Sequence, residues 1–334
     1  MRRRPPTSTR HPITRPKAAA GLAAAAIAVV AAATATTTPA AAAGAGTFAP
    51  YTDMSNSQES QLDTAITQHG VKTFTAGFVI GSGCNQIWGD TEPVGSDPYT
   101  DPEISKAKSE GASVIVSSGG AAGEPLAWTC TDQSAIDSGY QKIINAYGTT
   151  SLDFDVEGAA VADTAAATRN FTAMKDLQAA NPGLTFSVTL PVLPSGLTSD
   201  GVNILKAAKD AGVKIDTVNI MTMDYYQGSQ DMGQAAIQAA QSTLAQMQSV
   251  DSSYSYANLG ITPMVGVNDD GSTFTLDNAS AVESWAASNG VGRLSFWSVN
   301  RDQACSGGSG GAASPTCSGV SQNPLAFTDA FAGF

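Results

Sequence analysis

The chain has 334 residues, of which 29 are acidic and 17 are basic, so its formal net charge at pH 7 is −12. This acidic balance argues against nucleic acid as a partner, because binding to a phosphate backbone requires clustered Lys and Arg side chains. It suits a soluble protein that acts on a neutral or weakly cationic substrate.

The first 45 residues are predicted to be a secretory signal peptide that is not part of the fold. An apolar, Ala-rich run at 18–33 is followed by small residues that include Ala-Ala-Ala-Gly at 41–44. The run is preceded by a basic head made of Arg2, Arg3, Arg4, Arg10, Arg15 and Lys17. Removing these 6 of the 17 basic residues leaves 11 against 29 acidic ones, a formal charge of −18. The mature protein is expected to be secreted, extracellular, monomeric and free of a membrane anchor, with one large domain over 46–334.

From residue 46 onwards, short runs rich in Val, Ile, Thr or Phe alternate with Ala-rich stretches whose apolar residues recur at helical spacing. The runs predict strands at Thr47–Asp53, Val71–Ile80, Ala112–Ser118, Thr149–Glu157, Leu184–Leu190, Thr217–Tyr225, Asn258–Val267 and Arg293–Asn300. The stretches predict helices at Gln58–Gln68, Pro102–Glu110, Asp132–Tyr147, Ala160–Ala180, Gly201–Ala211, Asp231–Ser249, Asn278–Asn289 and Asn323–Phe331. Eight β/α units in regular alternation predict a single-domain α/β fold, a (β/α)8 TIM barrel.

A doubly wound open sheet is the alternative for such an alternation. That fold would place a Gly-rich phosphate loop after an early strand, and the only candidate is the segment 117–123, which reads Ser-Ser-Gly-Gly-Ala-Ala-Gly. Because this segment lacks the order G-x-G-x-x-G, the barrel is favoured.

Four cysteines remain in the predicted domain, and an exported chain favours disulfides. Three connectivities are possible. A bond between Cys305 and Cys317 would close a loop rich in Gly and Ser, which leaves Cys84 and Cys130 to join two neighbouring loops. No C-x-x-C spacing exists, so a zinc site is not expected, and no metal or other cofactor is predicted. His69 is the only histidine beyond the predicted signal, so triads that pair Ser or Cys with His are not expected.

The segment 151–158 places Asp153, Asp155 and Glu157 at a spacing of two, with apolar residues between them. Successive side chains of a strand point to opposite faces, so the three carboxylates are expected to share one face. Acids in such a line repel one another, which costs stability and raises at least one pKa. A cost without an evident structural return indicates chemistry, and the alternatives are an acidic edge strand or a cation site.

TIM-barrel active sites lie at the carboxyl ends of the strands and in the loops that follow them. Glu157 is the last residue of the fourth predicted strand. Side chains from other strands are expected at the same mouth, namely Ser118 and Gly119 after strand three, Asp224 and Tyr225 on strand six, Met264 on strand seven and Trp297 on strand eight.

These motifs resemble glycoside hydrolase family 18, the chitinases and their relatives. The family signature D-x-x-D-x-D-x-E at the end of barrel strand four matches Asp153, Asp155 and Glu157 in its last three acids. The family's S-x-G-G on strand three matches 117–120 in full. The segments 218–225 and 294–302 are similar to the family's strand-six and strand-eight segments, so the resemblance spans all eight predicted strands.

Two positions depart from the commonest family pattern. Thr150 stands where the signature has its first acid. A subset of bacterial and archaeal members resembling this chain shows a D-x-D-x-E core, so this change does not imply inactivity. Met223 stands where a tyrosine usually precedes the strand-six aspartate, and Tyr225 or Tyr226 is then the candidate phenol at the substrate.

The resemblance implies a secreted chitinase that hydrolyses β-1,4 bonds between N-acetylglucosamine units of chitin or its oligosaccharides. Glu157 would be the general acid and then the base, with its pKa raised by the two aspartates directly behind it. Asp155 would hold the acetamido N–H of the sugar and share a proton with Asp153. No second carboxylate lies at an obvious nucleophile position, which fits the retaining, substrate-assisted route of this family.

The remaining site residues would bind the sugar. Trp297 offers a flat apolar face for the ring. Asp224 would hydrogen-bond the distorted sugar, and its alternative role is an ion pair inside the barrel. Trp88 and Trp128 would line outer subsites or pack within loops. The substrate-binding positions also include Ser118, Gly119, Met223, Tyr225 and Met264.

Two other functions remain open at this stage. An endo-β-N-acetylglucosaminidase that acts on N-glycans would use the same acids. A non-catalytic barrel that binds chitin or another carbohydrate is the second alternative. Because such proteins typically lose the acid and Glu157 is present, an enzyme is favoured.

Overall fold

The computed structural model describes residues 46–55, 59–89, 92–308 and 311–334, so the predicted signal peptide lies outside the described residues. Parallel strands of the described part form a closed barrel with eight positions. In order around the barrel these are β1 (Thr47–Phe48) with β2 (Tyr51–Asp53), β3 (Thr73–Ser82), β6 (Ser113–Gly119), β7 (Ser151–Asp155), β8 (Thr185–Pro191), β9 (Thr217–Met221), β10 (Leu259–Thr262) and β13 (Arg293–Leu294). The predicted α/β fold, a (β/α)8 barrel, is confirmed.

The first barrel strand closes the sheet by changing its partner. Its first half, 47–48, pairs with β13, whereas its second half, 51–53, pairs with β3. Pro50 lies between the halves, where it has no N–H to donate, and its carbonyl accepts a hydrogen bond from the Thr75 N–H at 2.8 Å. The first and last described strands of the barrel are thereby joined, which removes the open edges of a flat sheet.

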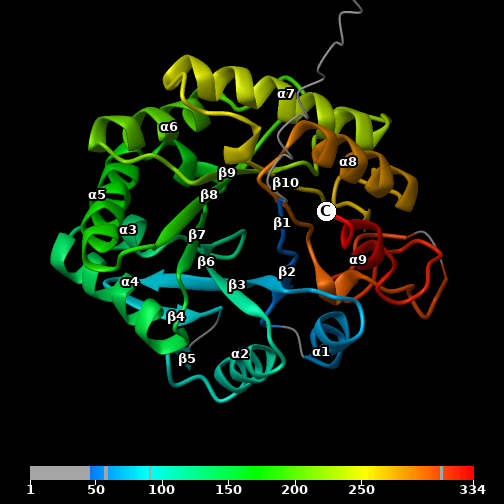
Figure 1. The fold of residues 1–334 in the computed structure, drawn as a ribbon, viewed down its shortest axis with the longest axis horizontal. Helices are drawn as coiled ribbons and strands as arrows, with labels where there is room; N and C mark the ends of the chain where they lie inside the picture. The colour runs from blue at the N-terminus through cyan, green and yellow to red at the C-terminus, as the bar shows by residue number, and fades with distance from the viewer. Residues whose placement is uncertain (1–45, 56–58, 90–91, 309–310) are drawn as a thin grey trace, which may run out of the picture. The chain divides into compact units, whose positions relative to one another are not determined.

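Helices surround the strands, as Figure 1 shows. They are α1 (Glu59–Thr67), α2 (Thr100–Ser109), the short α3 (Leu126–Thr129), α4 (Gln133–Tyr147), α5 (Thr164–Ala180), α6 (Ser199–Ala211), α7 (Met232–Val250), α8 (Leu276–Asn289) and α9 (Ala326–Phe331). Several begin at a side chain that accepts a free backbone N–H of the first turn, which explains their starting points: Asp132, Asp163, Thr198, Asp231 and Thr275. None of the described helices has the length and apolar character needed to cross a membrane.

The helices predicted from the sequence are all present, although their ends shift by a few residues. The largest shift is at α5, which begins at Thr164 and not at Ala160. The residues between, 158–162, form the 3₁₀ helix η1, and the Asp163 side chain then caps α5. Local hydrogen bonds in η1 and at the Asp163 cap therefore set the first residue of α5.

Several predicted strands end early. β7, β9 and β13 end at Asp155, Met221 and Leu294, because the chain leaves the sheet ladder there to build the loops at the mouth of the barrel. Two antiparallel additions were not predicted: β4 (Asn85–Trp88) with β5 (Glu92–Pro93) beside β3, and a hairpin of β11 (Gly266–Val267) with β12 (Thr273–Phe274) after β10. These strands are too short for sequence periodicity to reveal them.

Both disulfides that the sequence favoured are confirmed. Cys84, in the turn between β3 and β4, is bonded to Cys130, which directly follows α3. Cys305 is bonded to Cys317 and closes the loop that precedes α9. The two bonds therefore fasten loops that carry little regular structure.

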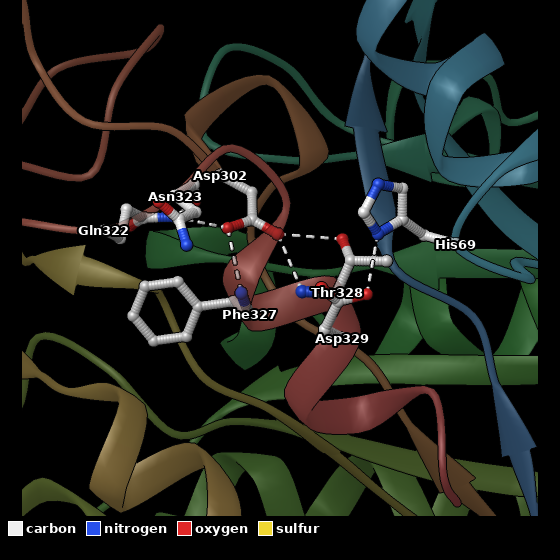
Figure 2. Close-up of polar contacts among 7 residues, drawn as sticks. All are labelled: His69, Asp302, Gln322, Asn323, Phe327, Thr328 and Asp329. Carbon is white, nitrogen blue, oxygen red and sulfur yellow. Dashed lines mark hydrogen bonds and ion pairs between the residues drawn. The ribbon is translucent and has the colours of Figure 1, made fainter.

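A single buried carboxylate, that of Asp302, anchors the last helix to the barrel, as Figure 2 shows. Its oxygens accept hydrogen bonds from the backbone N–H groups of Phe327 at 3.0 Å and Thr328 at 2.7 Å. The Thr328 hydroxyl, at 2.8 Å, and Gln322 Nε2, at 2.6 Å, donate to the same carboxylate. These bonds satisfy free N–H groups at the start of α9 inside a dry environment.

A second contact ties α9 to the first helix of the barrel. His69, which follows α1, has its Nδ1 atom 2.6 Å from Asp329 Oδ1, and the aspartate side chain is 60% exposed. The one histidine among the described residues therefore contacts α9 and does not line the pocket.

Replacing Asp302 by Ala is expected to lower the free energy of unfolding by about 3 kcal/mol or more, because buried donors would lose their acceptor. Equilibrium unfolding in urea measures this loss. The matched control is Asp329→Asn, which removes an exposed ion pair worth at most about 1 kcal/mol. Equal losses in the two variants would contradict the role of Asp302 as the anchor of α9.

Candidate active site

Side chains along β7 alternate between the inside of the barrel and the surrounding helices, as the sequence predicted. Asp153 and Asp155 lie inside the barrel and are 0% and 4% exposed. Phe154, between them, points to the helices, where its ring centroid lies 5.0 Å from that of Tyr140 on α4. Glu157 follows two residues after the strand end and reaches the mouth of the barrel.

Asp153 is held by hydroxyl groups on both of its oxygens. Oδ2 accepts from the Tyr51 hydroxyl at 2.8 Å and from the Ser117 hydroxyl at 2.6 Å. Oδ1 accepts from the Ser187 hydroxyl at 2.5 Å and from the Thr189 hydroxyl at 2.8 Å. The donors come from β2, β6 and β8, so this carboxylate links strands on both sides of β7.

A buried cation completes this network. The Arg293 guanidinium, on β13, donates from one terminal nitrogen to the Ser187 hydroxyl at 2.7 Å, and Ser187 in turn donates to Asp153. The residue is only 8% exposed, and the negative charge of Asp153 partly offsets the cost of burying the guanidinium. Asp153 is therefore fully hydrogen-bonded inside the barrel.

Asp155 has a different environment one step closer to the mouth. Burial raises its pKa well above the usual range, and the charges of Glu157 and Asp153 add to that effect. Its Oδ1 atom has no hydrogen-bond partner among the described residues. A buried carboxyl oxygen without a partner is costly, so this atom is available to a donor from a bound molecule.

Glu157 is partly buried, and burial is the main cause of its raised pKa. The second cause is the negative charge of Asp224, which lies in the loop after β9. The repulsion expected between Asp155 and Glu157 is present in the structure, and Asp224 from a different strand adds a charge that was not predicted to act on Glu157. The reason is the fold, which brings the loops after β7 and β9 to the same mouth.

The loop after β9 is held by the turn between β11 and β12. The Asp224 carboxylate accepts a hydrogen bond from the Asp270 N–H at 3.0 Å, and the Tyr226 N–H donates to the Asp270 carboxylate at 3.0 Å. Asp224 and Tyr226 have φ angles of 47° and 52°, a region that non-glycine residues rarely adopt. Such strain is typical of functional sites where the surroundings hold the backbone in place.

An aromatic floor lies at the bottom of the mouth. The rings of Trp297 and Phe78 are stacked, with their centroids 5.5 Å apart and an interplanar angle of 21°. Tyr51 packs at 6.1 Å from Trp297 while its hydroxyl reaches Asp153. The floor thus rests directly on the polar network inside the barrel.

These groups surround one pocket of about 160 Å³, several times the volume of about 30 Å³ that one water occupies in the liquid. Among the residues predicted for the site, the pocket is lined by Asp155, Glu157, Met223, Asp224, Met264 and Trp297. The other lining side chains were not predicted from the sequence: Tyr51, Phe78, Ala121, Thr189, Met221, Thr262 and Asp269. An Asp-Asp-Gly turn after the seventh predicted strand was a signal that could have indicated Asp269.

Two predicted site residues on β6 have other positions. Ser118 is in register with Phe154, on the face that points to the helices, and its neighbour Ser117 is the one that reaches Asp153. Gly119 does not line the pocket. It has a φ of 116°, and a Cβ atom there would lie 1.9 Å from the Asp155 carbonyl oxygen. Glycine therefore lets β6 pass closely beside the end of the acidic strand.

Three predicted aromatic contacts also lie outside the pocket lining. Trp88 is 3% exposed, and its Nε1–H donates to the Tyr147 hydroxyl at 2.6 Å, so it packs within the fold. Trp128 donates to the Ala160 carbonyl at 2.9 Å. Tyr225 is 3% exposed, and its hydroxyl has no partner among the described residues. These side chains pack against neighbouring parts of the fold, and their positions near strand ends in the sequence could not reveal that packing.

The chemistry of the pocket is that of carboxyl groups. In the described ranges, no group of three or more His, Cys, Asp or Glu side chains could hold a metal ion. Glu157, with its raised pKa, can donate a proton at the mouth, and Asp155 can stabilise a positive charge or accept an N–H. The Trp297 face and the Met223 and Met264 side chains give the pocket apolar walls.

The chain is similar to curated proteins that are named as chitinases. It is 34% identical over 277 residues to a probable bifunctional chitinase/lysozyme of Escherichia coli (strain K12), and the match covers 76% of this chain and 31% of that relative. It is 34% identical over 274 residues to Endochitinase 11 of Metarhizium anisopliae, covering 76% of this chain and 52% of that relative. The chain therefore spans about a third to a half of the length of these curated relatives. No protein-family model matches.

Solved structures of one archaeal protein share the fold closely. The catalytic domain of a hyperthermophilic chitinase from Pyrococcus furiosus is 33% identical with a TM-score of 0.78, covering 86% of this chain and 94% of that one. Catalytic-site mutants of active domain 2 of a chitinase from the same organism, complexed with chito-oligosaccharides, are 32% identical with a TM-score of 0.77 and the same coverage.

Gly119→Ala is expected to lower the free energy of unfolding by more than about 2 kcal/mol, because the new Cβ would clash with the backbone of β7 as well as strain its own φ. Gly111→Ala is the matched control, since its φ of 98° is similarly unfavourable but a Cβ atom there would have nothing within 4 Å. Urea unfolding of both variants separates clash from strain. A loss at Gly119 no greater than that at Gly111 would rule out close passage of β6 as the reason for this glycine.

Proposed function

Because the chain belongs to glycoside hydrolase family 18, we propose that it is a chitinase, an enzyme that hydrolyses β-1,4 bonds between N-acetylglucosamine units. The observation that carries this proposal is the meeting of Asp155, Glu157 and Trp297 in one pocket. The pocket supplies an acid, a polar partner for a substrate amide and a flat apolar floor for a sugar ring. The chito-oligosaccharides bound in the archaeal structures support the same substrate class.

Glu157 is proposed as the general acid and then the base. Cleavage needs a proton on the leaving oxygen, and a carboxyl group supplies it near neutral pH only if its pKa is raised. Burial and the charge of Asp224 both act in that direction on Glu157. After the leaving group departs, the ionised Glu157 would remove a proton from the attacking water.

Asp155 is proposed to bind the substrate's acetamido N–H. In the substrate-assisted route, the acetamido oxygen attacks the anomeric carbon and forms an oxazolinium ion, so the configuration is retained. The unpartnered Oδ1 of Asp155 suits an N–H donor from that group.

Asp153 is proposed as a positioning residue. The family resemblance implies that it shares a proton with Asp155, and its oxygens accept four hydroxyl hydrogen bonds that fix its position. A carboxylate so held would act as a fixed negative charge behind Asp155, one of the charges that raise the pKa of that residue.

Secretion is part of this proposal. Disulfides form and persist in oxidising compartments outside the cytosol. The bonds Cys84–Cys130 and Cys305–Cys317 support an exported enzyme, as does the signal peptide predicted for residues 1–45. An exported chitinase would meet its polymeric substrate outside the cell.

Glu157→Gln is expected to reduce hydrolysis of acetylated chitin oligomers by about 10² to 10⁴-fold, the usual contribution of general acid–base catalysis. Product release is measured by chromatography that resolves the anomers, for wild type and variant. Wild type should release β-anomeric products from acetylated chains and should leave fully deacetylated chains intact. A glycoprotein with N-glycans, offered in parallel, tests for endo-β-N-acetylglucosaminidase activity.

Glu283→Gln on the outer helix α8 is the control for this experiment, since it makes the same chemical change away from the pocket. A loss below about tenfold in Glu157→Gln would be incompatible with a general acid at this position. Inverted products, or equal cleavage of deacetylated chains, would exclude the acetamido route while leaving a glycosidase in place.

Asp224→Asn is expected to move the alkaline limb of the pH profile of kcat/KM to lower pH. The enzyme loses activity as the pH rises through the pKa of Glu157, because the acid is then ionised. Removing the negative charge of Asp224 stabilises ionised Glu157, so its pKa falls. Asparagine keeps an oxygen that can accept the Asp270 N–H. A limb that stays in place or moves to higher pH would contradict this coupling.

A further inference from the structure

Arg301 is a buried cation that does not line the pocket. It ends the 3₁₀ helix η3 (Val299–Arg301) and is 1% exposed. Burial lowers its pKa to about 10, so the guanidinium is still charged at neutral pH. A charge inside the fold is tolerated only when its donors find acceptors. The proposed reaction gives no task to this charge, so its place must have another reason.

The guanidinium covers one edge of β11. Nη2 donates to the Val265 carbonyl at 2.9 Å and to the Val267 carbonyl at 2.6 Å. Nη1 donates to the Ser314 carbonyl, in the loop that the Cys305–Cys317 bond closes. Within the described part of the chain β11 pairs with β12 alone, so the guanidinium occupies the edge where a further strand would otherwise donate.

The backbone after the disulfide completes the same edge. The Val267 N–H donates to the Ser318 carbonyl at 2.7 Å, and the Ser318 N–H donates to the Gln303 carbonyl at 2.9 Å. A Cβ atom at Gly266, whose φ is 77°, would lie 1.9 Å from the Ser318 carbonyl oxygen. The two backbones therefore pass each other in close contact, which only glycine permits at this position.

One disulfide joins the two segments that meet β11. Cys305 lies shortly after Arg301, and Cys317 directly precedes Ser318. We call these four residues the clasp. None of them lines the pocket, so their hydrogen bonds reach the reaction only through the segment that they hold.

The held segment carries groups of the active site at both ends. Met264 lines the pocket and forms a β-bridge with Trp297. Asp269 also lines the pocket, and the Asp270 N–H donates to the Asp224 carboxylate at 3.0 Å. A shift of β11 would therefore move a wall of the pocket and the partner of Asp224 together.

We propose that Arg301 is a positioning residue of the active site and that the Cys305–Cys317 bond keeps it in that role. The clasp fixes β11, and β11 with its turn fixes the Asp224 carboxylate near Glu157. This inference rests on the proposed chitinase function. Loosening the clasp would let Asp224 move away from Glu157 while the barrel stays folded.

The test compares Cys305→Ala/Cys317→Ala and Cys84→Ala/Cys130→Ala with wild type on acetylated chitin oligomers, at a temperature where all three are folded. The two bonds span sequence separations of 12 and 46 residues. Closing the longer loop gives the greater stabilisation in the chain-entropy description, so a pure stability effect would harm the second variant more. Positioning predicts the reverse. We expect kcat/KM to fall by about tenfold or more in the first variant, because small misplacements at an active site slow the reaction strongly, and to stay near wild type in the second.

The pH profile separates positioning from a general loss of stability. Glu157 faces the charges of Asp155 and Asp224, and Asp224 faces those of Asp269 and Asp270. Replacing the disulfide-bonded cysteines by alanine changes no charge. If Asp224 moves away, its negative charge raises the pKa of Glu157 less, so the alkaline limb of kcat/KM is expected to move to lower pH in the variant without Cys305 and Cys317.

Arg301→Lys tests the guanidinium while keeping its charge, which matters because Arg301 lies near the charges of Asp269 and Asp224. A lysine ammonium donates from a single nitrogen and does not reproduce the planar fork that reaches several carbonyls. This variant is expected to show the same two changes as the loss of the Cys305–Cys317 bond, a lower kcat/KM and an alkaline limb at lower pH.

Two results would overturn the role of the clasp. One is an equal loss of kcat/KM in the two disulfide variants, and the other is an alkaline limb that stays at its wild-type pH without Cys305 and Cys317. If wild type cleaves no acetylated oligomer, the proposed function fails. The clasp is then decided by amide hydrogen exchange, which should be faster over 264–270 without the Cys305–Cys317 bond than without the Cys84–Cys130 bond. Equal exchange in this segment would contradict the clasp.

Discussion

The site depends on one buried carboxylate, Asp153, and on the groups that hold it. Hydroxyl groups from β2, β6 and β8 donate to its two oxygens, and Arg293 from β13 reaches the same network through Ser187. A charge inside a barrel is tolerated only when it is paired and fully hydrogen-bonded. The network therefore fixes how these strands stand around β7, and with them the floor on which the pocket rests. Tyr51 shows the connection most directly, because its hydroxyl bonds Asp153 while its ring supports Trp297.

Two acids with raised pKa values stand in front of this anchor, and their causes differ. Burial and the charges of its neighbours along the chain, Glu157 and Asp153, raise the pKa of Asp155. Burial and the charge of Asp224 from the loop after β9 raise the pKa of Glu157. The difference suits different tasks. A deeply buried group can act as a fixed partner for a substrate amide, and a group near solvent can exchange its proton with the leaving oxygen and with water. Neither task requires a second carboxylate as nucleophile.

The loop after β9 and the β11–β12 turn hold each other in place at the mouth of the barrel. The charge of Asp224 acts on Glu157, and the N–H of Tyr226, two residues later, donates to the Asp270 carboxylate. Asp270 holds both through one N–H and one carboxylate. Their left-handed backbone conformations are strained, and the β11–β12 turn supplies the hydrogen bonds that maintain them. The β11–β12 turn therefore holds both Asp224 and Tyr226 in place.

Local patterns in the chain were enough to predict the barrel and the acidic face of β7, because periodicity and alternation are local properties. Strand ends also indicated Asp224, Met264 and Trp297, since the carboxyl ends of barrel strands must converge, whereas Met223 was indicated by the family resemblance. Packing between distant segments places Ser117, and not Ser118, against Asp153. It also buries Trp88 against Tyr147 and brings the charge of Asp224 close to Glu157. Packing between distant segments also places Phe78, Thr189 and Asp269 in the lining of the pocket. These facts depend on which residues meet across strands and loops, and burial and hydrogen bonding between distant segments settle that choice.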